Sequence, residues 1–133
     1  MRDELLLIGR IVFSLTFLLY GVRHLTQTEG STAYAAYKKV PAPRLMVLFT
    51  GVAMVIGGLA VIFGFWMDAA ALGIAIFVIA SGLFMHRFWE EDDVQTRQIE
   101  MAQFMKNVSI AGAALILVAV SEHAPYTLTD GIF

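Results

Sequence analysis

Few side chains in this sequence can do acid–base or ligand chemistry, and five of them fall at the ends of long apolar segments. They are His24 near the end of the first segment, His86 at the end of the third with Trp89 just beyond it, and Lys106 and Asn107 at the start of the fourth. Imidazole, ammonium, amide and indole groups that converge from three helices would suit a quinone or a lipid headgroup. These five residues therefore predict a ligand-binding site, whereas a single interfacial histidine is more often structural. Two histidines can also ligate haem, which requires His24 and His86 to face each other within the protein.

Arg10 lies about five residues inside the first apolar segment. A charged side chain at the centre of a bilayer costs roughly 2.5 to 3.5 kcal/mol, and less near an interface. Arg10 therefore either extends to the nearer interface or faces the other helices and binds an anionic or polar group. No acidic residue lies at a comparable depth in the other segments to pair with it.

Charge and cysteine content exclude several classes of function. Nine Lys and Arg against eleven Asp and Glu give a net charge of −2, which argues against a nucleic-acid partner. The chain has no cysteine, which excludes disulfides, thiol nucleophiles and cysteine-ligated zinc or iron–sulfur centres. We predict no metal site and assign no catalytic residue.

The composition predicts the elements that position these residues. The chain of 133 residues is 59% hydrophobic and only 15% charged, against about a quarter charged in soluble domains. A bilayer span needs about 20 apolar residues. Four segments qualify, at about residues 5–25, 45–66, 69–86 and 104–120, and the last begins as a polar helix near Val94. We predict one domain over residues 1–133, an all-α integral membrane four-helix bundle whose first span is retained because no signal cleavage site follows it.

The connection between the first two spans predicts a short helix. Ser31 or Thr32 could cap this helix, which carries Tyr34 and Tyr37 on one face. The Val40–Pro43 segment, with two prolines, ends it before the second span. We expect an interfacial amphipathic helix with its tyrosines inward and the two following lysines toward lipid headgroups.

Charged residues predict the topology. Four acids in a row, Glu90 to Asp93, are typical of a solvated face at a helix N-terminus, and the alternative is a docking surface for a basic partner. The connections between spans 1 and 2 and between spans 3 and 4 lie on one side of the membrane. Of the nine Lys and Arg residues, only Arg2 and Arg10 belong to the other side. The basic residues of the first side are Arg23, Lys38, Lys39, Arg44, Arg87, Arg97 and Lys106. The positive-inside rule therefore predicts cytoplasmic connections and termini outside.

Several of these motifs together resemble the DoxX family of small four-helix membrane proteins. The shared features are Gly9-Arg10 and Gly21 in span 1, the Val40–Pro43 segment, Gly57-Gly58 and Gly64-Phe65 in span 2, the His86–Trp89 segment and the Phe104–Gly112 segment. The last two segments are the most specific. One departure is that many members carry an acidic residue in the second span, where this chain has Ala53 to Ile56 around Met54.

The resemblance implies a multi-pass protein of the bacterial cytoplasmic (inner) membrane that is associated with redox physiology. Related chains form part of thiosulfate:quinone oxidoreductase, and others resemble membrane partners of oxidative-stress proteins. The first hypothesis is accordingly a non-catalytic subunit that anchors soluble redox proteins, and the second is a quinone-binding oxidoreductase subunit. The third is a small transporter, although the repeated halves and broken helices of transporters are missing. Small residues at four-residue spacing, such as Ala69 and Gly73, also permit a homo-oligomer in the lipid bilayer.

Overall fold

The computed structural model describes residues 1–133, and helices are its only regular secondary structure. The elements are α1 (Arg2–Thr26), α2 (Thr28–Tyr37), α3 (Pro43–Phe63), α4 (Met67–Met85), η1 (Phe88–Glu90), α5 (Val94–Val120) and η2 (Ser121–His123). Helices α1, α3, α4 with η1, and α5 with η2 are long and apolar enough to cross a membrane. The all-α fold with four spanning helices is thereby confirmed.

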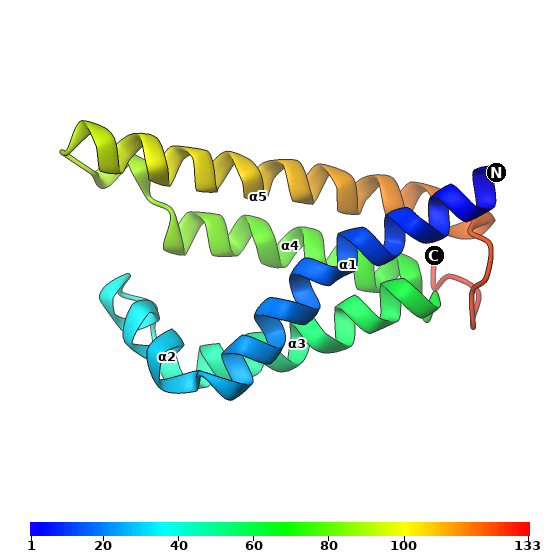
Figure 1. The fold of residues 1–133 in the computed structure, drawn as a ribbon, viewed down its shortest axis with the longest axis horizontal. Coiled ribbons are helices and arrows are strands. Elements are labelled where there is room, and N and C mark those ends of the chain that lie inside the picture. Colours follow the sequence, from blue (N-terminus) through cyan, green and yellow to red (C-terminus); the bar gives the residue numbers. More distant parts are fainter.

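The four long helices form two pairs (Figure 1). Helix α1 packs along α3, and α4 packs along α5. Both termini lie at one end of the bundle, and α2 and η1 lie at the other. A shared apolar core joins the pairs, with Phe17 from α1, Met54 from α3, Ile74 from α4 and Ala111 from α5.

Two glycines set the geometry of α3. Gly21 of α1 lies so close to α3 that an added Cβ would meet Val55 Cγ2 at 2.8 Å. Gly64 ends α3 in the left-handed conformation, at φ 62°, and its backbone N–H bonds to Ala60 O. Helix α3 therefore ends at Phe63, three residues before the expected end of the second span.

Most of the surface is apolar. Only 24 of the 133 residues are buried. Leu5, Phe49, Ile76 and Ile116, one from each long helix, are more than half exposed. A surface of this kind is stable in contact with acyl chains rather than water, so the bundle belongs in a lipid bilayer.

The short helix between the first two spans is present, with three differences from expectation. The tyrosines do not both face inward, because Tyr37 is 78% exposed and Tyr34 is 47% exposed. Helix α2 begins at Thr28, after the single residue Gln27, rather than after Ser31 or Thr32. The expectation that both lysines point to headgroups is wrong for Lys38, because its ammonium turns inward to a carboxylate of α5. The placement of α2 on a membrane surface stays a prediction.

The acidic run lies largely exposed at the N-terminus of α5, as the sequence predicts, and its last residue caps the helix. Asp93 is the N-cap of α5, and its carboxylate accepts hydrogen bonds from Thr96 N and Thr96 Oγ1, both at 2.8 Å. These two hydrogen bonds lower the pKa of Asp93. Helix α5 begins at Val94, close to the polar start expected for the fourth span.

Candidate functional site

The most connected group of charged side chains centres on Glu100 of α5, which is only 9% exposed. One carboxylate oxygen accepts a hydrogen bond from Lys38 Nζ at 2.7 Å. The other lies 2.8 Å from His86 Nδ1. Lys38 follows α2 and His86 follows α4, so this carboxylate ties three elements together at the end of the bundle opposite the termini.

Further contacts hold Lys38 in place. Arg87 donates from its guanidinium to Lys38 O at 2.9 Å. The Lys38 ammonium lies 5.9 Å from the ring centre of Tyr34 and 6.0 Å from that of Tyr37, within cation–π range. Burial lowers the pKa of Lys38, but the hydrogen bond and charge of Glu100 outweigh it and hold the pKa above the usual 10.5. We call Lys38, His86, Arg87 and Glu100 the Glu100 cluster.

An aromatic cluster adjoins these residues. The rings of Phe88 and Trp89 lie 5.1 Å apart, and each meets Phe104 of α5 edge to face, at 5.6 and 5.8 Å. Phe104 is four residues after Glu100, so both lie on one face of α5. The edge-to-face packing fixes η1 against α5 and sets the direction in which the chain leaves His86.

The structure distributes the five sequence-predicted site residues over separate contacts. His86 belongs to the Glu100 cluster and Trp89 to the aromatic cluster next to it. His24 Nδ1 instead lies 3.2 Å from Thr50 Oγ1, between α1 and α3. Asn107 is buried and donates to Val78 O of α4 at 3.0 Å. Lys106 is exposed and contacts Gln103 of its own helix.

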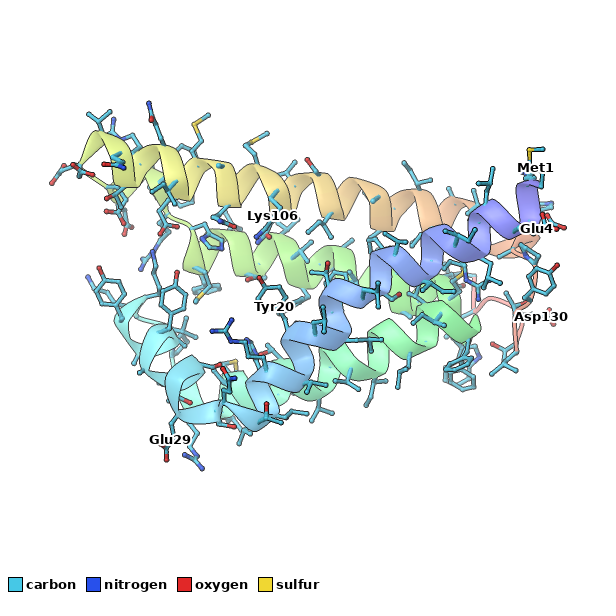
Figure 2. The ribbon with its side chains drawn as sticks, in the orientation of Figure 1. Met1, Glu4, Tyr20, Glu29, Lys106 and Asp130 are labelled. Carbon is cyan, nitrogen blue, oxygen red and sulfur yellow. The ribbon has the colours of Figure 1, made fainter.

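These contacts do not bring the five predicted residues to one site. His86 and Trp89 lie beside α5, whereas His24 lies in the α1–α3 pair and bonds to no other member of the set. Lys106 is exposed partway along α5 (Figure 2) and also bonds to no other member of the set. The two histidines therefore have separate partners, rather than the shared site that haem ligation requires.

Sequence reasoning missed Glu100, and a periodic signal could have found it. Glu100, Phe104, Asn107 and Ala111 recur at spacings of four, three and four along α5, which places them on one helix face. The last two are buried in the structure, as Glu100 is. A carboxylate on a face that continues into the core predicts a paired, buried acid.

Arg10 is fully buried, and all its hydrogen-bond partners are backbone carbonyls. Its Nε donates to Val61 O at 2.8 Å, and its terminal nitrogens donate to Ile62 O and to Pro125 O, both at 2.6 Å. The guanidinium therefore faces the protein interior and binds polar groups, with no acidic partner. Two of these carbonyls belong to the last turn of α3, where the helix dipole favours a cation.

The sequence is similar to those of known membrane proteins. The sequence model of the DoxX family matches residues 5–87, which is more than half of the chain. Inner membrane protein YphA of Escherichia coli K12 is 30% identical over 116 residues, covering 87% of this chain and 82% of that protein. Inner membrane protein YqjF of the same strain is 28% identical over 131 residues, covering 96% and 92%. No solved structure gives a significant match. The chain therefore belongs to the DoxX family and is an integral membrane protein.

Proposed function

We propose that this chain is a non-catalytic membrane subunit that anchors soluble redox proteins at the cytoplasmic membrane. The observation that carries the proposal is that the buried charged groups are bonded within the chain. Glu100 is bonded to Lys38 and His86, and Arg10 to four backbone carbonyls, while the buried amide of Asn107 donates to Val78 O. These groups stabilise the helix arrangement, so they support a structural rather than a catalytic role.

The end that carries α2 and η1 is the face proposed for the partner, on the cytoplasmic side. In the predicted topology, seven of the nine Lys and Arg residues belong to this half of the bundle. Trp89 is 49% exposed there, beside the exposed Glu90 and Asp92. An exposed tryptophan with a charged rim is the kind of surface that protein partners use. A C-terminal reporter fusion that is active only in the cytoplasm would contradict this sidedness.

Purification in mild detergent from cells with near-native expression tests the proposal. The chain should recover a soluble flavin, thiol or metal redox protein in constant ratio. An Asp92→Arg variant should recover at least several-fold less of it. Glu122→Arg is the matched control, because Glu122 is also exposed but lies at the opposite end. Recovery of no redox protein, or equal loss with both variants, contradicts the proposal.

A second candidate function is a quinone-binding subunit, and one feature of His86 favours it. Its Nδ1 is bonded to Glu100, which leaves Nε2 without a protein partner. In the neutral ring whose Nδ1–H donates to Glu100, Nε2 can accept from a quinol hydroxyl. In the protonated ring it can donate to a quinone carbonyl. The neighbouring Trp89 and Phe104 offer faces and edges for an aromatic ligand.

Tryptophan fluorescence tests this second function directly. Trp66→Phe leaves Trp89 as the sole tryptophan, because the chain has two. A short-chain ubiquinone should then quench Trp89 saturably, and His86→Ala should abolish the saturable part. His24→Ala is the matched control, because His24 bonds within the α1–α3 pair. Linear, unsaturable quenching in all variants would refute the quinone site.

A further inference from the structure

The C-terminal segment, residues 125–133, lies at the end of the bundle that carries the termini (Figure 1). Helix α3 stops at Phe63 and α4 starts at Met67, whereas α1 begins at Arg2 and its Arg10 reaches the last turn of α3. Arg10 is eight residues after Arg2, or about 12 Å along the helix axis. Along the bundle axis, the α3–α4 turn therefore lies closer to the middle of the bundle than the start of α1 does. The C-terminal segment runs beside that turn in Figure 1.

Two buried charges of opposite sign hold this segment by its backbone. The Arg10 guanidinium donates to Pro125 O at 2.6 Å and to Tyr126 O at 3.3 Å. The Asp68 carboxylate, also fully buried, accepts from Ile132 N at 2.5 Å and from Phe133 N at 2.9 Å. Arg10 lies at the C-terminus of α3 and Asp68 in the first turn of α4, so each charge also complements a helix dipole.

The α3–α4 turn bonds to the middle of the segment. Leu128 N donates to Phe63 O at 3.1 Å, and Thr129 N donates to Gly64 O at 3.3 Å. Trp66 N donates to Thr129 Oγ1 at 2.8 Å. The segment has no helix of its own, yet these bonds supply partners for backbone groups along its length. Irregular backbone is tolerated at membrane depth when protein groups satisfy it in this way.

The large apolar side chains of the segment are exposed while its backbone is held. Tyr126, Leu128, Ile132 and Phe133 are 62%, 72%, 54% and 63% exposed. They continue an apolar surface on the turn itself, where Phe63, Phe65 and Trp66 are 54%, 44% and 49% exposed. The long helices also expose large apolar side chains, such as Leu5 on α1 and Ile116 on α5. Aromatic residues at a helix end are typical of the bilayer interface.

We propose that residues 125–133 form a strap that lies in the membrane interface, held by Arg10 and Asp68, with its apolar side chains in contact with lipid. The partner of this surface is the bilayer. The burial of Arg10, the bonded backbone and the exposed apolar side chains support that occupant over water. The strap also links the two helix pairs, since Arg10 belongs to α1 and Asp68 to α4.

Spin labelling tests the strap, because the chain has no native cysteine. Nitroxides are attached to Leu128→Cys and Ile132→Cys in liposomes of phosphatidylethanolamine and phosphatidylglycerol. The collision rate of each nitroxide with oxygen, which partitions into lipid, is measured. It is compared with the collision rate of the same nitroxide with a nickel chelate present on both sides of the membrane. Leu115→Cys on α5 is the lipid-facing reference, and Asp92→Cys, exposed between η1 and α5, is the aqueous reference. The strap labels should have an oxygen-to-nickel ratio several-fold above that of Asp92→Cys. Ratios equal to the aqueous reference overturn the proposal.

A glycine substitution tests whether Asp68 holds the strap. A Cβ at Gly131 would lie 2.8 Å from Asp68 Oδ2, so Gly131→Ala should displace the strap and raise nickel collisions at Ile132→Cys several-fold. Gly112→Ala on α5 is the matched control, because nothing lies within 4 Å of its Cβ position. The Leu115→Cys label, in either background, reports whether the bundle itself is intact. Unchanged collisions in the Gly131→Ala background would overturn the role of Asp68.

Discussion

Replacing Glu100 by glutamine removes a charge that three elements share. Glutamine has the same size, but one of its two terminal atoms becomes a donor and faces Lys38 Nζ or His86 Nδ1, now 2.7 and 2.8 Å from the carboxylate. A hydrogen bond to a charged group contributes about 1.5–3 kcal/mol, and loss of one partner of a buried ion pair costs about 3–5 kcal/mol. The Lys38 side chain is 11% exposed and can turn partly to solvent. We therefore expect Glu100→Gln to lower the free energy of unfolding by about 2–4 kcal/mol.

Reversible unfolding in mixed micelles, followed by tryptophan fluorescence, measures this loss. Glu122→Gln is the matched control, and we expect a change within about 0.5 kcal/mol because Glu122 is exposed. A double-mutant cycle with Lys38→Met should give a coupling energy of about 1–3 kcal/mol. A Glu100→Gln loss no larger than that of the control, or simple additivity with Lys38→Met, would refute a stabilising role for the cluster.

Three further predictions concern packing, pH and capping. Gly21→Ala should lower the unfolding temperature in a thermal melt, because its Cβ would meet α3, whereas Gly9→Ala should not, since nothing lies within 4 Å. Because folding raises the pKa of Lys38, its pairing with Glu100 contributes its full stabilisation of the fold below pH 10.5. That contribution is lost as the pH rises through the folded-state pKa of Lys38. The free energy of unfolding measured against pH should show this loss in the wild type and not in Lys38→Met. Asp93→Ala should increase amide hydrogen exchange in the first turn of α5, with unchanged exchange in its last turn.

The membrane-spanning helices could be predicted because lipid imposes a length and a composition on each span. The end of α3 could not be placed from hydropathy alone, since Phe65 and Trp66 are as apolar as the residues before them. The backbone decides that boundary, through the left-handed conformation of Gly64. The start of α5 was predictable, because Asp93 is the last of four acids before a helical segment.

The contacts of the charged residues were less predictable, because they depend on tertiary structure. Glu100 and Lys38 are 62 residues apart in sequence, and they meet only because α2 folds back toward α5. Arg10 binds backbone carbonyls, which every residue has, so no side chain in the sequence marks its partners. The resemblance to the DoxX family implies an acidic residue in the second span near Met54. In this chain Met54 is only 6% exposed and lies in the apolar core. Arg10 is therefore satisfied in this chain without a carboxylate on α3.

Site-specific cross-linking in native membranes tests the anchoring function most directly. A photoreactive amino acid replaces Asp92 at the end with α2 and η1, and in a matched variant it replaces Leu115 on the lipid-facing side of α5. Position 92 should form a cross-link to one soluble redox protein, whereas position 115 should not. Cross-links from position 92 to lipid alone, to further copies of this chain alone, or to the same proteins as position 115 would contradict the anchoring function.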